Sequence, residues 1–123
     1  MGKTKEVTWS RRGDVYLVNF DPTLGAEIRK TRPALVIQND IANQWSLITI
    51  VAAITSYSAP EIYPTEVVVE AGEGGLRTKS IIKLDQVRSI DKQRLKCKLG
   101  QIKPNTLMAV NRALIISLEL VAI

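Results

Sequence analysis

The sequence contains no histidine and only one cysteine, and these two shortages narrow the chemistry open to it. Without histidine, the chain cannot build Ser-His or Cys-His nucleophilic systems or a metal site that uses imidazole. Cys97 alone cannot form an internal disulfide or a thiolate zinc site, which favours a reducing, cytoplasmic setting. We interpret Cys97 as a bystander thiol, because no histidine can activate it. Any catalysis must use Arg, Lys, Thr, Ser, Tyr or isolated carboxylates.

Other signals are missing as well. No apolar run is long enough to span a membrane, and residues 1–10 lack the apolar core of a secretory signal. The sequence shows no internal repeat, no low-complexity segment and no carboxylate cluster at metal-like spacing. With 123 residues the chain has the length of one domain. We therefore expect a flexible tail at 1–10 and a single domain at 11–123, with no metal and no cofactor.

Positively charged side chains are absent from a long central stretch of the sequence. The formal net charge is +5, yet no Lys or Arg occurs between Pro33 and Leu76. Apart from Lys3 and Lys5 near the N-terminus, the cations lie before this stretch, at Arg11, Arg12, Arg29, Lys30 and Arg32, and after it, from Arg77 to Arg112. This distribution suits a polyanionic partner. The alternative is that solvated lysines only keep a small domain in solution.

The pattern of apolar residues predicts many short strands followed by one helix. Composition rich in β-branched residues predicts strands at 15–20, 34–39, 47–55, 65–70, 79–84 and 86–90, with a further one at 98–102. We expect residues 40–44 to be a short connector with one helical turn. From Leu107 to Val121 the apolar period is helical, with Asn105 or Thr106 as N-cap after Pro104. We expect a mostly β (β+α) fold, a small partly open antiparallel barrel with the C-terminal helix across one face.

The stretch 25–40 joins a cationic segment to a buried strand at Arg32-Pro33. Pro33 biases Arg32 toward an extended conformation at the mouth of that strand. If strands 34–39 and 47–55 pair antiparallel with Asn39 opposite Ile48, Arg32 faces Thr55. A guanidinium beside a hydroxyl at a strand end rimmed by loops suits a phosphate group. The alternative is a charged loop that keeps a strand end soluble.

Several short motifs occur together in one order. They are Arg12-Gly13-Asp14-Val15-Tyr16, then Pro22, Gly25 and Glu27, then residues 32–37, 53–55 and 86–95. In this order and spacing, from about residue 11 to 120, the chain resembles the MazF/PemK family of toxin endoribonucleases of type II toxin–antitoxin systems. The resemblance implies an SH3-like barrel, a homodimer, and metal-independent, sequence-selective cleavage of single-stranded RNA. It also implies a labile antitoxin whose acidic C-terminal tail occupies the RNA groove.

The resemblance also assigns residues. The family's catalytic arginine falls on Arg32 and its catalytic threonine on Thr55. The expected RNA-binding residues, including two loop cations, are Glu27, Arg29, Lys30, Asn39, Ser56, Ser80 and Gln86. The loop departs from a common family version with Gln and glycines after the glutamate, so the preferred RNA sequence cannot be taken from relatives. Asn39 has an alternative role as the cap of the connector.

The expected reaction needs neither histidine nor metal. The 2′-OH of the RNA attacks the adjacent phosphorus, while Arg32 and Thr55 stabilise the developing charge. The general base is unassigned. The guanidinium of arginine keeps its proton at neutral pH, so it cannot accept the proton of the 2′-OH. The alternative function is a non-catalytic toxin on the same fold that poisons DNA gyrase by protein contact; intact Arg32 and Thr55 favour the enzyme. The tyrosines after Thr55, Tyr57 and Tyr63, either stack on bases or pack.

Overall fold

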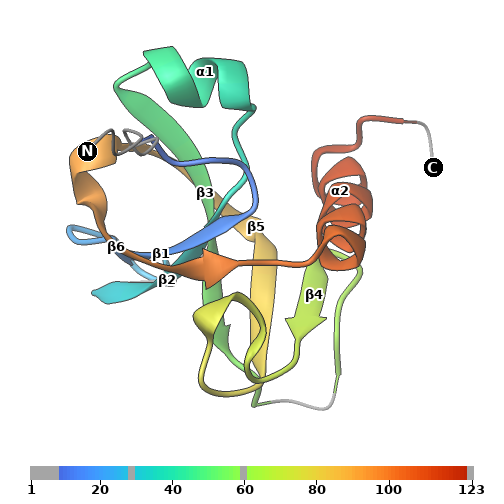
Figure 1. Cartoon of the computed structure of the whole chain (residues 1–123). Helices are drawn as coiled ribbons and strands as arrows, with labels where there is room; N and C mark the ends of the chain where they lie inside the picture. Colours follow the sequence, from blue (N-terminus) through green and yellow to red (C-terminus); the bar gives the residue numbers. More distant parts are fainter. Residues whose placement is uncertain (1–8, 28–29, 59–60, 122–123) are drawn as a thin grey trace, which may run out of the picture.

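The computed structural model describes residues 9–27, 30–58 and 61–121, and six antiparallel strands dominate it (Figure 1). The sheet order is β4-β5-β3-β2-β1-β6. The strands are β1 (Asp14–Asn19), β2 (Thr31–Val36), β3 (Ile48–Ser56), β4 (Glu66–Val69), β5 (Ser80–Asp91) and β6 (Leu95–Gln101). The other elements are helices α1 (Asp40–Trp45) and α2 (Pro104–Leu118) and the 3₁₀ turns η1 (Glu73–Gly75) and η2 (Lys92–Arg94). The expected fold class, a curved β sheet with one C-terminal helix, is confirmed.

The sheet bends strongly, so that β3, β5 and β4 run up and down the view of Figure 1 while β1, β2 and β6 run across it. Helix α2 packs beside β4 and β5. Alternate residues of the central strands belong to two separate core clusters. Leu35 and Ala52 lie in the cluster that includes Val110 of α2, whereas Ala34 and Ala53 lie in the other. Burial on both faces explains why these strands read as continuous apolar runs.

Several boundaries differ from the sequence prediction, and three of these differences have a clear physical reason. Strand β2 covers Thr31–Val36 rather than 34–39, because its first three residues pair with β1 alone and Pro33 needs no N–H toward β3 there. The two predicted strands 79–84 and 86–90 are one strand, β5, interrupted by a register shift opposite Ala52 and Ala53. Helix α2 begins at Pro104, with Lys103 at the N-cap position and no side-chain cap, so neither Asn105 nor Thr106 caps it.

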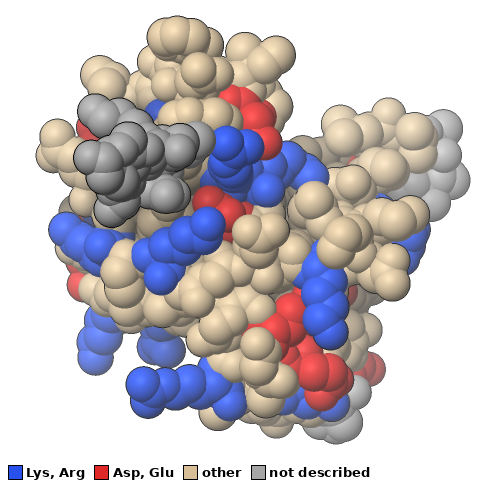
Figure 2. Space-filling view, in the orientation of Figure 1, with Lys and Arg blue, Asp and Glu red and all other residues tan. Residues whose placement is uncertain are grey.

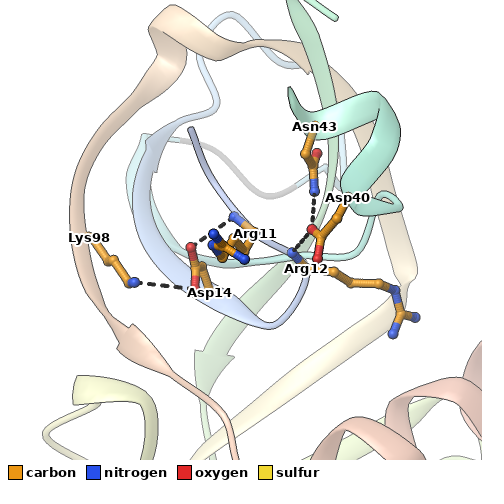
Figure 3. A network of polar contacts seen from close by, with 6 residues as sticks. All are labelled: Arg11, Arg12, Asp14, Asp40, Asn43 and Lys98. Atoms are coloured by element: carbon orange, nitrogen blue, oxygen red, sulfur yellow. Dashed lines mark hydrogen bonds and ion pairs between the residues drawn. The ribbon is translucent and has the colours of Figure 1, made fainter. Parts of the chain in front are cut away.

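The Arg-Gly-Asp motif at the start of β1 ties that strand to both helices, and Figure 3 shows its contacts with Asp40 of α1 and with Lys98. Arg12 donates its backbone N–H to Asp40 Oδ1 at 2.7 Å, its Nε to the Ile37 carbonyl at 2.8 Å and its Nη2 to Asn111 Oδ1 at 2.7 Å. Asp14 accepts a bond from the Arg11 N–H at 2.9 Å and pairs with Lys98 at 3.4 Å. The motif therefore has a structural role at the opposite end of β2 from Arg32.

Among the described residues, no helix has the length and apolar character needed to cross a membrane.

Candidate active site

The pairing of β2 with β3 brings Arg32 and Thr55 to one end of the sheet. The observed pairs are Ala34 with Ala53, Leu35 with Ala52 and Val36 with Val51, and this is the register predicted from the sequence. Pairing stops at Ala34, although β3 continues to Ser56 alongside β5. Arg32 and Thr55 therefore lie just beyond the last pair, where the two strands separate.

A cavity of about 360 Å³ opens where these strands separate. Its polar lining consists of two arginines and four hydroxyl side chains, namely Arg32, Arg77, Thr55, Ser56, Thr78 and Ser80. The remainder is largely apolar, from Leu17, Pro33, Ile54, Gly75, Leu76 and Leu99. No carboxylate occurs among the described residues that line it. Guanidinium and hydroxyl donors without a competing anion suit a phosphate group.

Four of the residues predicted from the sequence meet at this cavity. Arg32 and Ser56 are exposed, Thr55 is half-buried, and Ser80 is buried with its hydroxyl donating to the Thr78 carbonyl at 2.8 Å. The hydroxyl of Ser80 is thus oriented by its own loop. A phosphate group placed in this cavity would meet Arg32 from β2 and Thr55 from β3, two strands held in register by the core.

Two further predicted residues, Glu27 and Gln86, line a second cavity of about 90 Å³. Its other lining residues are Phe20, Ala53, Val87 and Arg88. Glu27 accepts a hydrogen bond from the Leu24 N–H at 2.6 Å, which folds the loop back on itself. Arg88 donates to the Phe20 carbonyl at 2.6 Å. Gln86 lies within the register shift of β5, and such irregularities reorient side chains.

The structure does not bring the other predicted residues to these cavities. Asn39 lies beyond the far end of β2 and caps α1, where its side chain accepts a bond from the Ala42 N–H at 2.9 Å; its alternative capping role is confirmed. Lys30 is exposed at positive φ, and its N–H donates to Asp21 Oδ1 at 3.0 Å. Arg29 lies outside the described residues.

Sequence reasoning missed Arg77 and Thr78. The signal was visible, since Arg77 is the first cation after the central stretch without Lys or Arg. Their place at the cavity depends on the contact of η1 with β6, which no local pattern reveals.

Of the two loop tyrosines, Tyr57 has the Lys79 ammonium 4.4 Å from its ring centroid, and Tyr63 is exposed. In the part of the chain that the structure describes, no three or more His, Cys, Asp or Glu side chains gather as metal ligands would.

The arrangement defines a small β protein with a cavity lined by guanidinium and hydroxyl donors, and comparison with known proteins gives its family. A family model described as PemK-like, MazF-like toxin of type II toxin-antitoxin system matches residues 11–118. The chain belongs to this family. Endoribonuclease EndoA of Bacillus subtilis is 44% identical over 111 residues, which cover 90% of this chain and 96% of that protein.

Solved structures share the fold. MazF from Deinococcus radiodurans superposes with a TM-score of 0.77 at 27% identity, covering 90% of this chain and 97% of that one. An endoribonuclease from a Mycobacterial species, solved in complex with its cognate antitoxin, has a TM-score of 0.76 at 22% identity, covering 91% of this chain and 97% of that one. At that identity the second likeness speaks for the fold alone.

Proposed function

We propose that this chain is the toxin of a toxin–antitoxin pair and cleaves single-stranded RNA at short specific sequences in the cytoplasm without a metal ion. The observation that supports it most is the shared cavity of Arg32 and Thr55, at the end of two strands in fixed register. Its family membership and the endoribonuclease name of its 44% identical relative agree with the proposal.

The proposed reaction is transesterification by the RNA itself. The 2′ oxygen forms a bond to the adjacent phosphorus and loses its proton to solvent or an unassigned base. The bond from phosphorus to the 5′ oxygen breaks, and the leaving 5′ oxygen takes up a proton from solvent. The products are a 2′,3′-cyclic phosphate and a 5′-hydroxyl. Arg32 grips two phosphate oxygens and Thr55 donates a further hydrogen bond, so both stabilise the charge that develops in the transition state. The tethered nucleophile replaces a bimolecular encounter with water.

A substrate with a single deoxyribose on the 5′ side of the scissile phosphate tests this mechanism. It keeps the phosphates and bases that the protein contacts but lacks the nucleophile, so it should bind and remain uncut. The measurement is a gel of this oligonucleotide beside its all-RNA twin, both with EDTA present. Cleavage of both at comparable rates would rule out attack by the 2′-OH. Intact RNA with inhibited DNA supercoiling would instead indicate the gyrase-poison alternative.

The proposal includes two protein partners, a second copy of this chain and a cognate antitoxin whose acidic C-terminal tail lies in the RNA groove. Membership in a family of toxins from toxin-antitoxin systems supports the second partner. The net charge of +5 and the arginines at the large cavity suit an acidic peptide as well as RNA.

A further inference from the structure

Arg77 is a second arginine on the cavity that holds Arg32, and it follows the 3₁₀ turn η1 rather than a strand. Its side chain is exposed, and among the described residues it has no hydrogen bond or ion pair. We propose that Arg77 binds a second phosphate of the RNA strand, next to the one held by Arg32. The inference rests on the proposed ribonuclease function and adds a binding residue to it.

The segment that carries Arg77 is held firmly against β6. A Cβ placed on Gly75 would lie 2.0 Å from the Leu99 carbonyl oxygen, and one on Gly100 would lie 2.7 Å from the Gly74 carbonyl carbon. Real Cβ atoms do not approach this closely, so only glycine permits the contact. Leu76 is 5% exposed and part of the core, which turns the next residue, Arg77, toward solvent at the cavity rim.

The far end of this segment is fixed as well. Ser80 pairs with Ser56 at the start of β5, and the Tyr57 N–H donates to the Lys79 carbonyl at 2.9 Å. Residues 76–80 are therefore anchored at both ends, and Arg77 reaches the cavity from a rigid base. Such a base lets a side chain contribute affinity without first ordering a loop.

The neighbouring cation, Lys79, differs from Arg77 in its surroundings. Its ammonium lies 4.4 Å from the centroid of the Tyr57 ring and 4.0 Å from Glu70 Oε2, and Lys79 does not line the cavity. The charge of Lys79 therefore has partners within the chain, namely the Tyr57 ring and the Glu70 carboxylate. Arg77 has no such neighbour among the described residues, and the cavity that it lines offers hydroxyl donors without a described carboxylate. Its environment thus favours an anionic ligand from outside the chain.

An RNA strand can contact both arginines of this cavity, because it carries one phosphate at every nucleotide. When Arg32 holds the scissile phosphate, a neighbouring phosphate of the same strand must pass close by. The cavity volume of about 360 Å³ lies in the range of sites for small ligands such as a nucleotide. Figure 2 shows further Lys and Arg side chains, with some Asp and Glu among them, on the face where β6 and β1 lie, so an RNA strand that ran on across this face would meet several cations. An arginine that touches only phosphate should affect binding and its salt dependence more than the chemical step.

The test compares Arg77→Ala and Arg77→Lys with Arg112→Ala, which removes the same charge from an exposed position on α2 outside the cavity. The ligand is the uncleavable single-deoxy oligonucleotide, and fluorescence anisotropy gives Kd at several salt concentrations. We expect Arg77→Ala to raise Kd about tenfold and to reduce the slope of log K against log salt by about 0.7. Arg77→Lys should keep the wild-type slope of log K against log salt, because the charge is retained, but should bind the RNA less tightly, because an ammonium lacks the forked donors of a guanidinium.

Cleavage of the all-RNA twin supplies the second readout. KM should rise in Arg77→Ala, while kcat falls by less than about threefold. The inference is overturned if Arg77→Ala shows the Kd and slope of Arg112→Ala, if it weakens binding of an acidic antitoxin peptide but not of RNA, or if kcat falls while KM stays unchanged. If wild-type protein binds the single-deoxy strand but never cuts its twin, the proposed function fails while the salt slopes still decide the role of Arg77.

Discussion

Among single residues, Arg32 has the most demanding proposed role, since it would hold a phosphate while lying next to the core. It occupies the second position of β2, exposed, with the buried residues Ala34, Leu35 and Val36 following Pro33. The core therefore positions the backbone of Arg32 but does not depend on its side chain. Changes at Arg32 should act on the reaction and leave the fold intact.

We expect Arg32→Lys to reduce cleavage by about 10²–10³-fold, because an ammonium cannot reproduce the two parallel hydrogen bonds of a guanidinium. Arg32→Ala should be at least as impaired. The measurement is the single-turnover cleavage rate of a long RNA, with unfolding midpoints to show that the variants fold. Arg112→Lys on α2 serves as the matched control. Near-normal turnover of a folded Arg32→Lys protein would contradict the bidentate role.

At the scale of elements, the sequence predicted the sheet better than its surroundings. The short connector between β2 and β3 suggested a register with Asn39 opposite Ile48, which aligns Arg32 with Thr55, and the observed pairs have this register. The position of Arg77 did not follow, because it depends on contact between η1 and β6, which are far apart in sequence. Asn39 was ambiguous because the same amide that can bind RNA can also cap a helix.

The contact between η1 and β6 yields a test of its own. Gly75 has a φ of +75° and no room for a Cβ, so Gly75→Ala should lower the free energy of unfolding by about 3 kcal/mol or more. Gly72 is the matched control, since its φ is +99° but a Cβ added there would meet nothing within 4 Å. Gly72→Ala should cost only about 1–2 kcal/mol of conformational strain. Equal losses in urea unfolding would show that the close approach to Leu99 is unimportant.

The edge strand β4 is attached to β5 by a partly buried ion pair. Lys83 Nζ lies 2.8 Å from Glu66 Oε2, and the Tyr63 N–H donates to Glu66 Oε1 at 3.0 Å. Burial acts to raise the pKa of Glu66, but the hydrogen bonds from Lys83 and Tyr63 outweigh it, so the pKa lies below its ordinary value. The hydrogen bond to Glu66 raises the pKa of Lys83, against a smaller opposing effect of burial.

These shifts predict a loss of stability in acid. Because the folded pKa of Glu66 is depressed, its contribution is complete above the ordinary pKa of about 4.3 and is lost as pH falls through the folded value. Urea unfolding between pH 7 and pH 3 should show a loss of about 1 kcal/mol from this pair, absent in Glu66→Gln. Glu70→Gln, at an exposed carboxylate, should keep the wild-type dependence. Identical acid profiles for Glu66→Gln and wild type would contradict the assignment.

At the scale of the whole molecule, the core clusters account for the sheet but leave large apolar side chains on the surface. Ile41, Trp45 and Leu47, in and just after α1, are between 77% and 80% exposed. A second group, Ile116, Leu118, Leu120 and Val121, lies in and after the last turn of α2 and is 42% to 63% exposed. A monomer that stays in solution seldom leaves extensive apolar surface uncovered.

We therefore expect the chain to be a homodimer at micromolar concentration. Light scattering should give twice the chain mass of 13.6 kDa. Leu47→Lys and Leu118→Lys place a charge in one group or the other, and the variant that shifts the mass toward the monomer identifies the face that pairs, because an unpaired buried charge opposes association. Gln44→Lys, an exposed polar position on α1, controls for the added charge and should leave the mass unchanged. A wild-type protein that remains monomeric would contradict the prediction and would require some other partner to cover these side chains.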